Sequence, residues 1–201
     1  MEKPKLLIVA GPNGSGKTSV TSDILEHQWR QGCIYINPDN IARDVFGDWN
    51  SAEAVIKAAR QAAELREDCL AKRASLIFET VLSAADKVAF VHRAKEAGYF
   101  VRLFFIGTDG PEINAARVAL RVMDGGHDVP IPKIISRYAK SIAQCAALAP
   151  VVDRLYVYDN SVNDAPAKLL FRASNGCLTK RYAEPHDWAS LIFQALSRPN
   201  G

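Results

Sequence analysis

The sequence lacks several features that would place it in a specialised class of protein. None of its four cysteines, Cys33, Cys69, Cys145 and Cys177, belongs to a C-x-x-C pair. We therefore expect no zinc site and interpret the thiols as reduced. No stretch approaches the roughly 20 apolar residues that a membrane-spanning helix needs. The apolar run over residues 6–10 is also too short for the core of a signal peptide. These absences predict a soluble, cytoplasmic protein.

A long run of basic residues is missing as well. The chain has 25 Lys and Arg against 22 Asp and Glu, and the net charge of +3 is spread along it. This mild excess suits an anionic ligand but does not indicate nucleic-acid binding, for which a basic stripe with interleaved aromatics would be expected. Repeats and linkers are not evident. We expect one domain over residues 1–201, because 48% apolar residues in a chain of this length can form one sizeable core.

Short apolar runs alternate with helical patterns along most of the chain. Strands are predicted at residues 6–10, 33–36, 76–78, 101–106 and 155–158. Helices are predicted at about residues 17–29, 51–72, 84–96, 111–123 and 132–148. This alternation indicates an α/β fold in three layers, a five-stranded parallel sheet covered by helices on both faces.

The C-terminal part has a different pattern. Residues 168–173 and 177–182 flank Asn175-Gly176, a strong signal for a β-hairpin. An amphipathic helix is predicted at about residues 185–196. No motif in this part indicates chemistry, and it could simply cover the edge of the sheet.

A phosphate-binding loop is the clearest chemical signal. Residues 11–18 fit G-x-x-x-x-G-K-[ST], between a predicted strand and a predicted helix. Glycines let backbone N–H groups converge on an anion, and the helix N-terminus adds positive charge. Lys17 is expected to reach the β and γ phosphates, and Thr18 to hold Mg²⁺. The predicted ATP-binding residues are Gly11, Pro12, Asn13, Gly14, Ser15, Gly16, Lys17, Thr18 and Ser19.

Polar residues at the ends of two further strands are candidates for the acceptor side. Asn37 and Asp39 follow the second strand, and Glu79 and Thr80 end the third. In open parallel sheets, ligands bind at the carboxyl ends of strands. Asp39 could therefore accept the proton of an attacking hydroxyl, or it could cap the following helix. Glu79 and Thr80 could bind substrate or order water around Mg²⁺, or they could face solvent.

Three arginines indicate a helical lid over about residues 117–137. Arg117 and Arg121 share one helix face, and Arg137 lies on the next helix beyond a Gly-rich loop. Arginines that close over phosphates neutralise charge in the transition state, although each could instead lie on a solvated surface. His127, in the loop, could bind substrate or stabilise the loop. Asp159 could mimic a Walker B carboxylate, but we favour a structural turn.

Together these segments resemble the zeta toxin family of P-loop kinases, in particular its short members. The resemblance covers roughly residues 5–161 and rests on the stretches GPNGSGKTS, INPDNIA, FETVLS, AKEAGYFVRLFFIG, RVMDGGHDVPIPKIISRY and YVYDNS. It implies a fold like that of adenylate or shikimate kinase. It also implies phosphorylation of a hydroxyl of UDP-N-acetylglucosamine, with ATP and Mg²⁺ as cofactors and a possible antitoxin protein as partner.

The resemblance also assigns roles to residues. Asp39 matches the catalytic base, Lys17 and Thr18 match nucleotide-binding residues, and Glu79 and Thr80 fall at substrate contacts. Asn37, in the stretch INPDNIA that also contains Asp39, is a further candidate for binding the substrate. Arg121 and Arg137 are our choice for the lid arginines, with Arg117 a close rival. The chain is shorter than the larger toxins and its lid reads GGHDVP, which leaves open whether its acceptor pocket is the same as theirs.

Two other functions remain open from the sequence. One is a kinase of another small hydroxyl compound. The other is an ATPase switch that yields no phosphorylated product. The sequence speaks against a switch, because it has no LSGGQ-type signature and no clear strand that ends in Asp-Glu.

Overall fold

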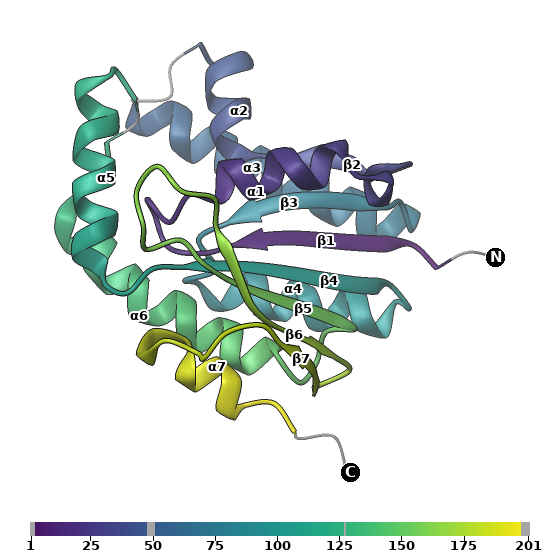
Figure 1. Cartoon of the computed structure of the whole chain (residues 1–201). Coiled ribbons are helices and arrows are strands. Elements are labelled where there is room, and N and C mark those ends of the chain that lie inside the picture. Colours follow the sequence, from purple (N-terminus) through teal and green to yellow (C-terminus); the bar gives the residue numbers. More distant parts are fainter. Residues whose placement is uncertain (1–2, 48–50, 127, 198–201) are drawn as a thin grey trace.

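A seven-stranded mixed sheet forms the centre of the structure, a computed structural model that describes residues 3–47, 51–126 and 128–197 (Figure 1). The strands are β1 (Lys5–Ala10), β2 (Ile34–Ile36), β3 (Leu76–Thr80), β4 (Phe100–Gly107), β5 (Arg154–Asp159), β6 (Lys168–Ser174) and β7 (Cys177–Arg181). Their order across the sheet is β2-β3-β1-β4-β5-β6-β7.

The prediction of a five-stranded sheet was wrong in its number of strands. The strands from β2 to β5 pair in parallel, but β6 pairs antiparallel with β5 and β7 antiparallel with β6. The turn at Asn175-Gly176 connects β6 and β7, with φ of 50° and 75°. The predicted hairpin is therefore present, and it extends the main sheet because β5 has a free edge to which β6 can add.

The helices follow the predicted pattern except for α2, which was not among the predicted helices, for the end of α1, which is shorter than predicted, and for the C-terminus. They are α1 (Lys17–Glu26), α2 (Pro38–Asp44), α3 (Ala52–Lys72), α4 (Ala85–Glu96), α5 (Pro111–Met123), α6 (Ile131–Leu148) and α7 (Ser190–Gln194), with 3₁₀ turns at Gln28–Arg30 and Asp187–Ala189. The long helix predicted at 185–196 is thus a 3₁₀ turn followed by a short α-helix. There Trp188 packs directly on Gly107, whose added Cβ would lie 2.3 Å from the indole.

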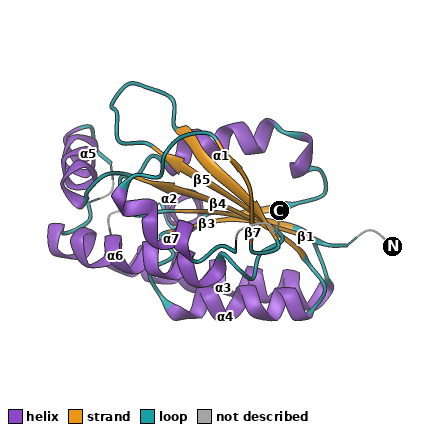
Figure 2. Cartoon of the chain, turned by 60° about the horizontal axis from the view of Figure 1, so that its bottom comes forward, coloured by secondary structure: helices purple, strands orange, loops and turns teal. Residues whose placement is uncertain are grey.

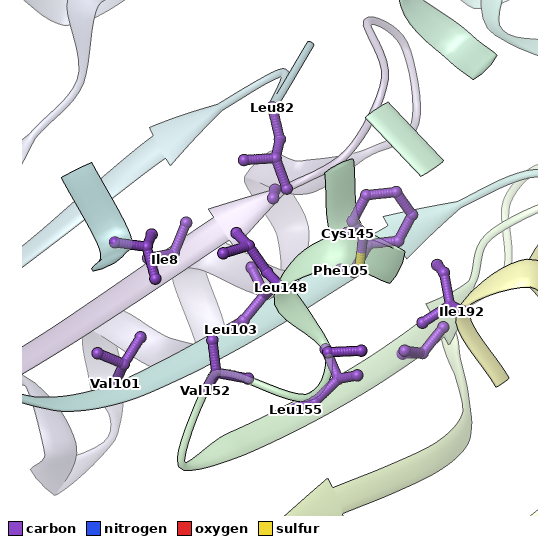
Figure 3. Packing of buried hydrophobic residues seen from close by; sticks show 14 of the residues in the cluster. Ile8, Leu82, Val101, Leu103, Phe105, Cys145, Leu148, Val152, Leu155 and Ile192 are labelled. Atoms are coloured by element: carbon purple, nitrogen blue, oxygen red, sulfur yellow. The ribbon is translucent and has the colours of Figure 1, made fainter. Parts of the chain in front are cut away.

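One face of the sheet carries the main hydrophobic core. Helices α3, α4, α6 and α7 lie side by side on this face (Figure 2). Leu148 of α6, for example, is fully buried beside residues of β4 and β5 (Figure 3). Truncating such a side chain to Ala typically costs about 2 to 5 kcal/mol, so this face accounts for much of the stability.

The opposite face also carries a helix, as predicted, but it is covered only in part (Figure 2). A smaller cluster there contains Val20 of α1, Leu7 and Val9 of β1, and Phe104 of β4. In Figures 1 and 2, α1 is the helix that lies over this face. The side chains of β5 on this face, Arg154, Tyr156 and Tyr158, are each only partly buried.

Candidate functional site

The phosphate-binding loop connects β1 to α1, and two reasons each exclude other residues at Gly14 and Gly16. Gly14 and Gly16 have φ of 75° and 84°, a region that other residues rarely adopt. A Cβ on Gly14 would lie 2.5 Å from the carbonyl oxygen of Asn114, and one on Gly16 would lie 2.1 Å from Nδ2 of Asn160. The loop is therefore held closely by α5 on one side and by the segment after β5 on the other.

Lys17 lies across this loop. Its Nζ donates hydrogen bonds of 2.9 Å to the carbonyl oxygens of Gly11 and Pro12. Burial lowers the pKa of Lys17 to about 8; the carboxylates of Glu79 and Asp39 act in the opposite direction, and Arg121 adds to the lowering. Burial thus disfavours the charged form of Lys17 in the ligand-free protein, and an anionic ligand in the loop would favour it.

The start of α2 positions Asp39. The side chain of Asn37 caps this helix, because its Oδ1 accepts a hydrogen bond of 2.9 Å from the backbone N–H of Asp39. The alternative that Asp39 itself is the cap is therefore wrong. Asp39 lies in the first turn of α2, its side chain is exposed, and it lines a cavity that the phosphate loop also borders.

Two polar side chains, those of Tyr35 and Asn37, hold Glu79 at the end of β3. The hydroxyl of Tyr35 donates to Oε1 of Glu79 at 2.5 Å, and Nδ2 of Asn37 donates to the same oxygen at 3.2 Å and to the Tyr35 hydroxyl at 3.0 Å. Burial and the hydrogen bond to Glu79 raise the pKa of Tyr35 well above its usual value. Tyr35 therefore stays protonated and remains a donor. Asn37 thus connects the carboxylate of Glu79 to the backbone of Asp39.

The two threonines of the site differ in their surroundings. Oγ1 of Thr80 accepts a hydrogen bond of 2.9 Å from the backbone N–H of Leu82, which has φ of 56°. Thr80 therefore supports the turn after β3. Thr18 is exposed at the first turn of α1, and both threonines line the same cavity.

The three arginines reach this cavity from α5 and α6, but they make different contacts. Nη1 of Arg117 donates to the carbonyl oxygen of Asn160 at 2.7 Å, and its Nε donates to Oδ1 of Asn163 at 2.9 Å. Arg117 is thus fixed to the segment after β5. Nη1 of Arg137 donates to Oδ1 of Asn13, in the phosphate loop, at 3.5 Å. Arg121 lies near enough to Lys17 to lower the pKa of that lysine.

These residues surround one cavity of about 440 Å³. Predicted residues that line it are Asn13, Gly14, Gly16, Lys17, Thr18, Asn37, Asp39, Glu79, Thr80, Arg117, Arg121 and Arg137. Ser19 is exposed on α1 and is not among the lining residues, and His127 lies outside the described residues. Gly11, Pro12 and Ser15 are buried in the loop itself.

Sequence reasoning missed three residues that support the site. Tyr35 lies on a short strand, and nothing local links it to Glu79, which is 44 residues away. Asn114 is fully buried against Gly14. Asn160 donates from Nδ2 to the carbonyl oxygen of Ser15 at 2.9 Å. For Asn160, the position directly after a strand was the available sequence signal, since the carboxyl ends of the parallel strands converge at this edge of the sheet.

Asp159 serves the structural role that the sequence favoured. It is buried, and its Oδ1 accepts hydrogen bonds from the hydroxyl of Ser161 at 2.6 Å and the indole N–H of Trp188 at 3.2 Å. His186 lies nearby, with Nδ1 2.7 Å from Oδ1 of Asp109. These contacts attach the C-terminal segment to the ends of β4 and β5.

The chain resembles known proteins both in sequence and in fold. The family model for zeta toxins matches residues 1–164. An uncharacterised protein of Haemophilus influenzae is 32% identical over 137 residues, which are 67% of this chain and 92% of that protein. No described helix combines the length and the apolar character needed to cross a membrane.

Two solved structures illustrate the similarity of fold. One comes from the PezAT chromosomal toxin–antitoxin system of Streptococcus pneumoniae, with a TM-score of 0.62 and 15% identity over 98% of this chain and 79% of that one. The other is the AvrRxo1-ORF1:-ORF2 complex with ATP, with a TM-score of 0.66 and 17% identity over 99% of this chain and 65% of that one. With the family model matching most of its length, the chain belongs to the zeta toxin family.

Proposed function

We propose that this protein is a kinase that transfers the γ-phosphoryl group of ATP to a hydroxyl of a small molecule, most specifically of UDP-N-acetylglucosamine. One observation carries the proposal: the carboxylate of Asp39 and the ammonium of Lys17 line the same cavity, with the phosphate loop at one wall. Family membership supports an ATP-using phosphotransferase. The nucleotide sugar is the acceptor that the family resemblance favours.

The proposed step needs one base and several cations. Asp39 accepts the proton of the acceptor hydroxyl, whose oxygen attacks the γ-phosphorus as the bond to the β-phosphate oxygen breaks and ADP leaves. Lys17, Arg121 and Arg137 neutralise the charge that spreads over the transferred group. Arg117 is held by Asn160 and Asn163, so we assign it to the nucleotide side of the cavity.

The oxygen donors of the cavity fit a magnesium ion. The hydroxyl of Thr18 and the carboxylate of Glu79 both line it, and Mg²⁺ prefers such hard oxygen ligands with several retained waters. When bound, the ion would neutralise phosphate charge. Glu79 is oriented by Tyr35 and Asn37, and we therefore propose that it contacts the acceptor or a water of the ion.

An ATPase switch is less consistent with this geometry. Hydrolysis also needs a residue that positions the attacking water, but a water needs little room, whereas the exposed carboxylate of Asp39 borders space that a second substrate can enter. For a partner, the fold shared with a toxin–antitoxin system leads us to propose a dedicated inhibitor protein. We expect this inhibitor to bind over the cavity that Asp39 and Lys17 line, because a protein that covers it blocks both substrates.

The test is direct detection of the product. Purified protein is incubated with ATP, Mg²⁺ and UDP-N-acetylglucosamine, and the sugar nucleotide is examined by mass spectrometry for one added phosphoryl group. We expect the product with the wild type and its loss with Asp39→Ala at unchanged ATP affinity. Full turnover in Asp39→Ala would refute the base. A panel of other sugars and hydroxyl compounds identifies the acceptor if the nucleotide sugar is unchanged.

A further inference from the structure

Asn160 directly follows β5 and lies against the phosphate loop. Its Nδ2 donates a hydrogen bond of 2.9 Å to the carbonyl oxygen of Ser15. A Cβ added to Gly16 would lie 2.1 Å from the same nitrogen. The amide of Asn160 therefore lies directly beside the peptide bond that joins Ser15 to Gly16. It takes no part in the transfer step proposed above, so the contact calls for a different explanation.

The orientation of this peptide decides which of its polar groups faces the cavity. The peptide is trans, and in a trans peptide the C=O and N–H groups point in opposite directions. Since Asn160 binds the C=O of Ser15, the N–H of Gly16 points away from Asn160. Gly16 lines the cavity, and its N–H forms no hydrogen bond within the described residues. A donor without a partner in a phosphate-binding loop is suited to an anion.

Glycine makes this orientation easy to lose. Gly16 has φ of 84°, and glycine adopts negative φ about as readily. The peptide could therefore rotate about its two flanking single bonds, which exchanges the directions of its C=O and N–H groups. In the rotated form the carbonyl oxygen of Ser15 would face a bound phosphate and repel it. The hydrogen bond from Asn160 thus stabilises the orientation that binds phosphate.

Asn160 can hold the loop because its own backbone is held on two sides. Its N–H donates to the carbonyl oxygen of Gly107, at the end of β4, at 2.9 Å. Its carbonyl oxygen accepts a hydrogen bond of 2.7 Å from Nη1 of Arg117, on α5. Arg117 also lines the cavity. Asn160 therefore connects the sheet and α5 to the phosphate loop.

We propose that Asn160 is a positioning residue for the phosphates of the nucleotide. Its amide holds the peptide between Ser15 and Gly16 so that the N–H of Gly16 donates to the β-phosphate. This role rests on the proposed function only in that the ligand is ATP or ADP. Nucleotides with a β-phosphate need the amide of Asn160, whereas AMP, which lacks that group, does not. A residue that only stabilised the fold would affect the binding of all three nucleotides alike.

The test compares ADP with AMP in the presence of Mg²⁺ and without an acceptor. Calorimetry gives the affinity for ADP, and competition with ADP gives that for AMP. Asn160→Leu keeps the branched shape of the side chain but has neither a donor nor a charge. It should lower the affinity for ADP about tenfold and change that for AMP by less than about twofold. Asn160→Asp, which places an acceptor against the carbonyl oxygen of Ser15, should lower the affinity for ADP at least as much.

Matched variants and the wild type decide the outcome. Gln31→Glu makes the same change from amide to carboxylate at an exposed position before β2 and should leave both affinities unchanged. If melting curves show that Asn160→Leu does not fold, Asn160→Ala replaces it with the same expectation. Unchanged affinity for ADP in either variant of Asn160, or an equal loss for ADP and AMP, would overturn the role of Asn160. A wild type that binds ADP no more tightly than AMP would overturn the nucleotide assignment of the proposed function as well.

Discussion

Asn37 stabilises two parts of the candidate site, so its removal gives a measurable prediction. Asn37→Ala removes the helix cap on the N–H of Asp39, worth about 1 kcal/mol. It also removes two hydrogen bonds, to Tyr35 and to the carboxylate of Glu79. We assign these about 1 kcal/mol together, since the groups are only half-buried and partly screened by water. The free energy of unfolding should therefore fall by about 2 kcal/mol.

Thermal unfolding followed by circular dichroism measures this loss. For a domain of this size, about 2 kcal/mol corresponds to a fall in Tm of about 4–8 °C. Asn37→Ser is the matched control, because serine can cap α2 but cannot reach Glu79 with an amide. It should recover about half of the lost stability. Equal stability of the alanine and serine variants would refute the role of the cap, and a Tm of Asn37→Ala equal to that of the wild type would refute the whole argument.

Three further predictions concern the loop and the C-terminal segment. Gly16→Ala should weaken ATP binding at least about tenfold in calorimetry, since its φ of 84° and a contact at 2.1 Å exclude a Cβ. Gly47→Ala is the control: at a φ of 72° with nothing within 4 Å of the added Cβ, it should lower only the stability. Equal ATP affinities of the two variants would contradict the role of Gly16. Because the pKa of Lys17 is about 8 without ligand, ATP affinity should fall as pH rises through about 8; a pH-independent affinity would show that its charge is not used. The pKa of His186 is raised, chiefly by its hydrogen bond with Asp109, so its stabilisation is present below about pH 6.5 and is lost as pH rises through the higher folded value. The difference in Tm between wild type and His186→Asn should therefore shrink with rising pH, and a constant difference would refute it.

The fold was largely predictable where local pattern decides the outcome. The helices predicted at 51–72 and 111–123 are both present: Ser51 caps α3 and Pro111 begins α5. The hairpin was also visible from Asn175-Gly176. That it adds to the main sheet was not, because the pairing of β5 with β6 depends on which edge is free in three dimensions. The length of the final helix was overestimated, because the packing of Trp188 on Gly107 cannot be predicted from the hydrophobic periodicity of that segment.

The candidate site was predictable where its residues are contiguous. The phosphate loop is one such stretch, and its geometry follows from its glycines. The function of Asp39 was ambiguous, since Asn37 and Asp39 can both cap a helix, and only the structure shows that Asn37 does so. Tyr35 could not be found, because its partner Glu79 is brought close by the pairing of β2 with β3.

The central claim is that the γ-phosphoryl group passes to a hydroxyl deprotonated by Asp39. It is tested most directly with ATP whose γ-phosphoryl oxygens carry a heavy isotope, incubated with the protein, Mg²⁺ and UDP-N-acetylglucosamine. The account predicts that the labelled oxygens appear on the sugar nucleotide with the wild type, and that Asp39→Asn forms almost no labelled product while still binding ATP. Label found only in inorganic phosphate, with the sugar nucleotide unchanged, would contradict transfer to this acceptor. Labelled sugar nucleotide formed at the same rate by Asp39→Asn would contradict the role of Asp39.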